Sequence, residues 1–200
     1  MLRALAVATM LAVGGSPALA LPGIMAETPG SRACYLRVYD AKHLAANPAQ
    51  RTVSMRISFR VERITGAIDS VPPLNRIRIE ATRRNVAQPL RAIGDCRFSE
   101  DANRDVQGNA RIASYPRAAG IVCSIAQDAS DEGGGAEPVL SASGETLTIH
   151  MDESLPMRRN RKLSDGESQT IDFRRSDAVL RLQRVAASEC DALDRAIVSE

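Results

Sequence analysis

The segment Thr52–Glu62 limits the possible folds of this chain more than any other, because apolar and polar residues alternate along its length. Every second residue is apolar: Val53, Met55, Ile57, Phe59 and Val61. Successive side chains of a β-strand point to opposite faces, so this pattern predicts a strand with one buried and one solvated face. In a helix the same residues would be scattered around the whole circumference.

Shorter alternations predict further strands elsewhere in the chain. They cover residues 34–38, 76–81, 111–115, 121–125, 146–151, 171–173 and 179–185. Turn-forming pairs such as Pro72-Pro73, Ser143-Gly144 and Asp165-Gly166, together with the run Gly133–Gly135, separate several of these segments. We therefore expect a mostly β fold, an antiparallel β-barrel or β-sandwich of about seven to nine strands. The pattern does not distinguish a closed barrel from a sandwich.

Only two short helices are predicted. Asp40 is placed to cap a helical turn over residues 41–46, which Asn47-Pro48 would end. A second helix is predicted over residues 188–197, with Ser188 as its cap and Cys190 fastening it to the core.

Residues 1–20 have the three parts of a cleavable secretory signal peptide. Arg3 supplies the positive charge, an apolar run over residues 5–13 follows, and Ala18-Leu19-Ala20 supplies the small residues of a cleavage site. The alternative is a retained membrane anchor, but the apolar run is too short to span a bilayer as a helix. We expect a periplasmic or secreted protein that does not span the membrane after cleavage. Residues 21–31 would form a flexible leader and residues 32–200 a single β domain.

Four cysteines remain in the exported chain, and we expect all of them to form disulfides. They are Cys34, Cys96, Cys123 and Cys190. An even number in an exported chain favours disulfides over metal ligation, and no CxxC spacing is present. Of the three possible connectivities we expect Cys96–Cys123, which closes a local loop, and Cys34–Cys190, which ties the two ends of the domain, although sequence alone does not choose among them.

The charge balance excludes a nucleic-acid partner on electrostatic grounds. The 26 basic residues less Arg3 leave 25, against 24 acidic residues, after cleavage of the signal peptide. A nearly neutral chain gains little from the phosphate backbone. The chain has no Trp and few other aromatic residues, so it offers little surface on which bases or sugars could stack.

No catalytic or metal-binding motif is present, and we expect no cofactor. Neither His43 nor His150 has a partner at metal-ligand spacing, and each is interpreted as a surface or capping histidine, with a pH-responsive role as the alternative. The GxSxG and SxxK motifs of serine nucleophiles are missing. The acidic, glycine-rich stretch over residues 128–135 is interpreted as a loop, with a weak calcium site as the alternative.

The densest positive charge lies in one short cluster: Arg158, Arg159, Arg161 and Lys162. We expect these residues in a loop between strands. The functional interpretation is a docking patch for an anionic partner such as a phospholipid head group, lipopolysaccharide or an acidic protein. The alternative is a solvated loop that Asp152, Glu153 and Asp165 partly neutralise.

Three stretches together resemble a known group of proteins. Residues 34–40 run into His43-Leu44, Val122-Cys123 precedes an Asp-containing, glycine-rich stretch that ends at Gly135, and residues 180–185 lead to Cys190. This arrangement is similar to that of small exported proteins of Gram-negative, largely alphaproteobacterial, species, a group with no assigned function. The resemblance implies a periplasmic location and structural cysteines, and it carries over no catalytic or binding residue.

These observations favour a non-enzymatic periplasmic β module that binds a small apolar ligand, an envelope component or a protein partner. An internal ligand would contact the inward-facing residues Met55, Ile57, Phe59, Ile79 and Ile149. One alternative is an inhibitor of a lysozyme or protease that acts through the acidic segment 128–137. The other is a hydrolase with no recognisable motif, which requires His43 or His150 to meet a carboxylate and a hydroxyl in the folded chain.

Overall fold

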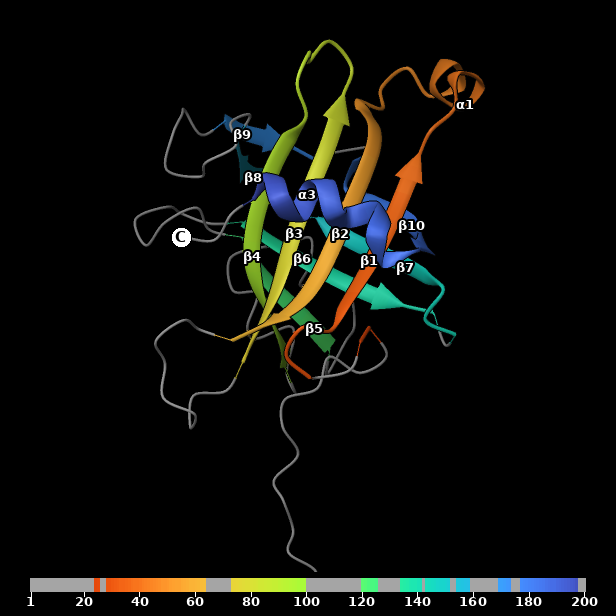
Figure 1. Ribbon diagram of the computed structural model, residues 1–200. Coiled ribbons are helices and arrows are strands. Elements are labelled where there is room, and N and C mark those ends of the chain that lie inside the picture. Colours follow the sequence, from red (N-terminus) through yellow and green to blue (C-terminus); the bar gives the residue numbers. More distant parts are fainter. Residues whose placement is uncertain are drawn as a thin grey trace, which may run out of the picture.

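A computed structural model shows that the chain folds into a closed antiparallel β-barrel (Figure 1). It describes residues 24–25, 28–63, 73–99, 120–125, 134–141, 143–151, 154–158, 169–173 and 177–197. The barrel strands are β1 (Arg32–Val38), β2 (Thr52–Glu62), β3 (Leu74–Arg83), β4 (Leu90–Ser99), β5 (Gly120–Ile125), β6 (Gly134–Leu140), β7 (Thr146–Met151) and β10 (Val179–Val185). The mostly β fold is confirmed, and the closed barrel rather than the sandwich is observed.

Each barrel strand pairs with the next along the chain, except where a small insertion separates β7 from β10. The insertion is a two-stranded sheet of β8 (Ser154–Met157) and β9 (Gln169–Asp172). Pairing of β10 with β1 closes the barrel. Because the strands alternate in direction, the end of β1 and the starts of β2, β4, β6 and β10 share one end of the barrel. Helix α1 (Ala41–Ala46) lies at this end, at the top of Figure 1, and we call it the α1 end.

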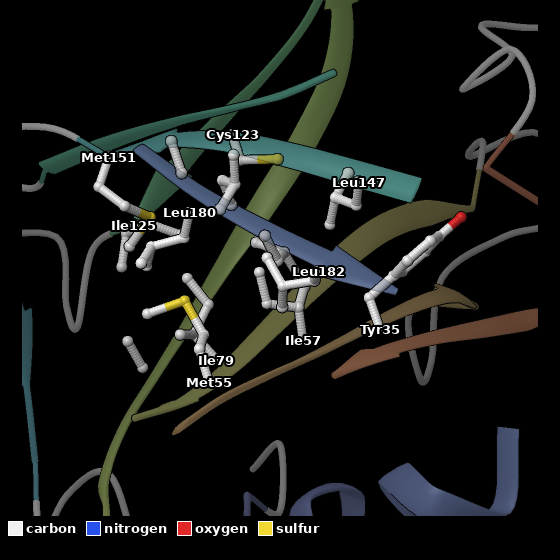
Figure 2. Packing of buried hydrophobic residues seen from close by; sticks show 14 of the residues in the cluster. Tyr35, Met55, Ile57, Ile79, Cys123, Ile125, Leu147, Met151, Leu180 and Leu182 are labelled. Carbon is white, nitrogen blue, oxygen red and sulfur yellow. The ribbon is translucent and has the colours of Figure 1, made fainter. Parts of the chain in front are cut away.

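The interior of the barrel is filled by apolar side chains from strands around its circumference. Met55, Ile57 and Phe59 of β2 are fully buried, as the alternation predicts, and they pair in register with Ala81, Ile79 and Ile77 of β3. Figure 2 shows side chains from β1, β2, β3, β5, β7 and β10 converging on this common core. A barrel of eight strands is just wide enough for its side chains to fill it.

Three strands were not predicted: β4, β6 and β8. The sequence of β6 begins inside the glycine run that we interpreted as a turn, and this interpretation is wrong for Gly134 and Gly135. A Cβ on Gly134 would lie 2.3 Å from Leu155 Cδ2 and 2.4 Å from the Ser154 carbonyl oxygen, so glycine allows β8 to pack there. A requirement of this kind comes from a segment 20 positions away, and local periodicity does not reveal it.

The first helix is confirmed and the second is corrected. Asp40 caps α1 by accepting a 2.7 Å hydrogen bond from the His43 backbone N–H. The C-terminal segment begins with a 3-10 helix, η2 (Ala187–Cys190), followed by α3 (Asp191–Ala196). Ser188 does not cap either one: the preceding residues are Ala186 and Cys190, and neither makes a side-chain cap hydrogen bond.

Both expected disulfides are present, Cys34–Cys190 and Cys96–Cys123. Cys96 and Cys123 lie directly opposite each other on β4 and β5. Cys34 faces outward from β1 and holds η2 against the outer wall, where α3 crosses β3 (Figure 1). Two disulfides are typical of an oxidising, extracellular type of environment.

The predicted signal peptide, the predicted strand 111–115 and the acidic stretch 128–133 lie outside the described residues. Within the expected leader, Ile24 is fully buried in the core cluster, and the Gly30 backbone N–H donates to the Val61 carbonyl oxygen at 2.9 Å. In the described part of the chain, no helix is long and apolar enough to cross a membrane.

Candidate functional site

A cluster of polar contacts lies at the α1 end, and Asp177 is at its centre. Asp177 is only 2% exposed. Its Oδ2 accepts hydrogen bonds from the backbone N–H groups of Arg51 at 3.2 Å and Thr52 at 3.1 Å, and it lies 3.7 Å from an Arg83 guanidinium nitrogen. A buried carboxylate needs such donors, because burying an unpaired charge is costly. Asp177 therefore fastens the segment before β10 to the start of β2.

Arg83 connects the same region to the β8–β9 insertion. Its two terminal nitrogens donate to the Asp172 carbonyl oxygen at 3.2 Å, and its guanidinium carbon lies 5.4 Å from the centre of the Phe173 ring. Burial lowers the pKa of Arg83, and the neighbouring Asp177 opposes this shift. With these contacts the Arg83 side chain is engaged within the protein, so its role here is structural.

Helix α1 adds a chain of polar and aromatic contacts. His43 Nε2 and Gln50 Oε1 are 2.9 Å apart, and Gln50 Nε2 donates to the Thr52 carbonyl oxygen at 3.0 Å. The Tyr39 ring stacks on the His43 ring with centroids 4.7 Å apart, and the Arg37 guanidinium carbon lies 4.7 Å from the Tyr39 centroid. Burial raises the pKa of Tyr39, while Arg37 opposes the shift.

This arrangement gives the hydrolase alternative no support. The described contacts of the His43 ring are with an amide and an aromatic ring, and a general base needs a proton donor and an orienting group within reach. His150 lies on β7, opposite Val179 of β10. Within the described residues, no group of three or more His, Cys, Asp or Glu side chains could hold a metal ion.

Arginines on the wall of the barrel are neutralised by carboxylates on neighbouring elements. The pairs are Arg56–Glu80, Arg91–Glu80, Arg76–Asp95, Arg78–Glu62 and Arg60–Asp194, with N–O distances from 2.6 to 3.4 Å. Most of them join adjacent strands of β2, β3 and β4, which is a stabilising arrangement for opposite charges in a sheet. This wall therefore presents little net charge to a partner.

Beneath α3 the same network becomes buried. The Arg78 side chain is 3% exposed, and its guanidinium lies 2.6 Å from Glu62 and 3.3 Å from Asp194 of α3. Ile93 of β4 packs beside it against Leu193 and Ile197. The sequence did not predict this buried role, because Arg78 is one of the polar residues in an alternating strand. Only η2 and α3, which we call the C-terminal cover, bury it.

At the α1 end, in contrast, five cations have no carboxylate partner among the described residues. They are Arg37, Lys42, Arg51, Arg84 and Arg158, and we call them the basic end. Two of these side chains contact neutral groups. Arg37 lies over the Tyr39 ring, and Arg84 donates to the Leu44 carbonyl oxygen. Two acids of this end are engaged in contacts of their own, Asp40 as a helix cap and Asp177 in its buried hydrogen bonds.

One member of the predicted docking patch belongs to the basic end. The backbone N–H and carbonyl groups of Arg158 exchange hydrogen bonds of 2.8 and 2.7 Å with Arg91 of β4, so Arg158 is held against the barrel directly after β8. Arg159, Arg161 and Lys162 lie outside the described residues. The other members of the basic end are far from Arg158 in the sequence, and charge clustering along the chain gave no sign of them.

The residues proposed to contact an internal ligand all belong to the packed core. Met55, Ile57, Phe59, Ile79 and Ile149 are fully buried in one cluster with their neighbours. Their packing against one another accounts for their burial, so the described interior carries no argument for a ligand. No protein family, curated protein or solved structure matches this chain. The function is therefore argued from the geometry alone.

Proposed function

We propose that this protein is a non-enzymatic binding module of the cell envelope, periplasmic or secreted, that docks an anionic partner through the basic end. The observation that carries the proposal is the contrast, within the described residues, between the neutralised wall and the five cations without carboxylate partners at one end of the same barrel. Clustered charge of one sign raises the local concentration of oppositely charged partners and speeds their association.

The rest of the fold suits such a role. The barrel is a rigid support with a filled interior and two disulfides, so it holds the basic end in one arrangement without ligand. The signal peptide predicted from residues 1–20 would deliver the chain to a compartment where these disulfides form. Anionic lipid head groups and acidic protein segments are the anionic surfaces that such a protein would meet there.

The test is binding to anionic probes at low and high salt. We expect the purified protein to bind polyglutamate, or vesicles that contain phosphatidylglycerol, and to ignore polylysine and vesicles of phosphatidylcholine alone. Binding should weaken as salt is added, because exposed charges are screened over a Debye length of about 10 Å at 0.1 M.

Charge reversal gives the matched comparison. Lys42→Glu and Arg51→Glu change exposed members of the basic end, and Arg195→Glu makes the same change on an exposed residue of α3. We expect the first two to weaken binding and the third to leave it unchanged. Equal effects of all three substitutions, or no binding of any anionic probe, would exclude docking through this end.

A further inference from the structure

The barrel closes through a short pairing between β1 and β10. Only three residue pairs join these strands, from Cys34↔Val185 to Leu36↔Gln183, whereas seven pairs join β1 to β2 and five join β10 to β7. Both strands continue toward the α1 end beyond the last pair. Strand β1 runs on to Val38, and β10 begins four residues earlier, at Val179.

Backbone hydrogen bonds show which way the unpaired residues of β10 face. The Arg184 N–H donates to the Glu145 carbonyl oxygen, and the Met151 N–H donates to the Ala178 carbonyl oxygen, each at 2.8 Å. The even-numbered residues of β10 therefore direct their backbone groups toward β7. Since alternate residues of an antiparallel strand face opposite neighbours, Val179 and Arg181 direct theirs toward β1, beyond the end of the pairing.

The same reasoning applies to β1. The Tyr39 N–H donates to the Val53 carbonyl oxygen at 2.9 Å, which places the backbone groups of Tyr39 on the β2 side. Val38 therefore directs its N–H and carbonyl groups toward β10, where the ladder has already ended at Leu36. The two strands thus leave backbone donors and acceptors on facing edges without ladder partners among the described residues.

Exposed hydrophobic side chains lie beside these backbone groups of β1 and β10. Val38 is 62% exposed and Val179 is 43% exposed, and they are the exposed large hydrophobic residues of the described chain. Arg181 is exposed on the same outer face of β10 and has no carboxylate partner in the described part of the structure. We call Val38, Val179 and Arg181, with their open backbone edges, the seam.

We propose that the seam binds an extended acidic segment of a partner protein, which adds to the barrel as a strand. This inference rests on the proposed function, because the seam lies beside the basic end and shares its charge. In strand addition, backbone hydrogen bonds supply affinity and alternate side chains supply specificity. A β-branched side chain of the segment would cover the two valines. Acidic side chains on the same face of the segment would contact Arg181 and the basic end.

Charge complementarity selects this occupant over the alternatives. A second copy of the chain would bring Arg181 and the basic end against their own copies, and like charges in such a contact repel. A lipid head group satisfies the cations but does not supply the alternating N–H and carbonyl groups that a strand edge requires. An extended acidic peptide supplies both.

The experiment measures fluorescence anisotropy of a labelled synthetic peptide of repeated Val-Thr-Glu-Thr, which places valine and glutamate on the same face of an extended strand. We expect saturable binding that weakens with salt, and no binding of the peptide with lysine in place of glutamate. N-methylation of every second backbone nitrogen keeps the charge and removes donors from one edge of the peptide. If each strand hydrogen bond contributes the usual net amount, every lost donor weakens binding about two- to tenfold.

Two variants of the protein test the seam itself. Arg181→Glu should weaken binding of the acidic peptide, and Arg195→Glu on α3 is its control. Val179→Pro removes one N–H that points to the seam and none that points to β7, so the barrel should still fold, as circular dichroism can verify. This substitution should weaken binding of the acidic peptide about two- to tenfold and leave binding of polyglutamate to the basic end unchanged.

The outcomes separate this inference from the proposed function. Binding that depends on Arg51 but is unaffected by N-methylation, Arg181→Glu and Val179→Pro would overturn strand addition and leave electrostatic docking in place. Binding to anionic vesicles without binding to the peptide would overturn it in favour of a lipid surface. Concentration-dependent dimerisation that Val179→Pro abolishes would show that a second copy occupies the seam, which also contradicts the proposal.

Discussion

Gly94→Ala is the sharpest test of the packing between β4 and β5. A Cβ at this position would lie 2.2 Å from the Ser124 carbonyl oxygen and 2.7 Å from Ile125 Cδ1, whereas ordinary contacts are 3.4–4 Å. The shortfall against the oxygen is at least 1.2 Å, from 3.4 less 2.2. The oxygen belongs to the backbone, so no side-chain rotation relieves the overlap, and β5 must shift relative to β4.

The cost should reach the upper part of the range for overpacked cores, about 3 kcal/mol. Alanine lowers the entropy of the unfolded chain and returns about 0.4–1 kcal/mol, so we expect a net loss of about 2–3 kcal/mol. This is a large share of the 5–15 kcal/mol that stabilises typical domains. Because the shift would also disturb the pairing of Cys96 with Cys123, oxidation should be checked in the purified variant.

Urea unfolding followed by far-ultraviolet circular dichroism, with the disulfides oxidised, measures the change. Gly30→Ala is the matched control, because a Cβ there meets nothing within 4 Å and only the φ of 91° opposes the substitution. It should cost about 1–2 kcal/mol. A Gly94→Ala protein within about 0.5 kcal/mol of the parent, the range of harmless surface changes, would refute the close approach of the two strands.

Three further predictions concern the core, the C-terminal cover and the pH dependence. Phe59→Ala should lower the free energy of unfolding by about 3–5 kcal/mol, since this ring is fully buried, and an equally stable variant would contradict the assignment of β2. Replacing Cys34 and Cys190 together with alanine opens a bridge between residues 156 positions apart and should cost about 2–5 kcal/mol. Amide hydrogens of η2 and α3 should then exchange faster with solvent, and unchanged exchange would show that the disulfide does not hold this cover. Burial raises the pKa of Tyr35 above 10.0, so its contribution to stability is complete below that pH and is lost as the pH rises through the raised folded-state value. Unfolding midpoints measured across this range should fall in the parent and fall less in Tyr35→Phe, and parallel curves would contradict this assignment.

Local features of the fold could be read from the sequence because their causes are local. The alternation in Thr52–Glu62 reports which side chains share a face, and this depends only on the two-residue period of a strand. Asp40 caps α1 through a residue three positions away, so a short motif predicts it. The even number of cysteines in a chain expected to be exported was enough to predict disulfides, and the expected pairing is the observed one.

Strands with small or glycine residues were missed because their character depends on distant segments. Strand β4 carries Ala92 and Gly94 on its inner face, where β5 approaches too closely for a larger side chain. The residues around Gly94 in the sequence do not predict this close approach of β5. Gly134 was interpreted as part of a turn for the same reason, because the packing of β8 against it is a tertiary event.

The sequence by itself determined the alternating faces of the predicted strands, the first helix and the use of the cysteines as disulfides. The tertiary structure alone decided that the sheet closes into a barrel and that Asp177 reaches a backbone group 125 positions away. It alone also brought to one end the five cations that have no carboxylate partner in the described part of the chain. It also decided that β1 and β10 separate after three residue pairs and leave the seam open. The physical reason is that the alternation of side chains along a strand depends only on residues that are neighbours in the chain. The contact partners of a residue depend instead on closure of the barrel, which joins segments from opposite ends of the sequence.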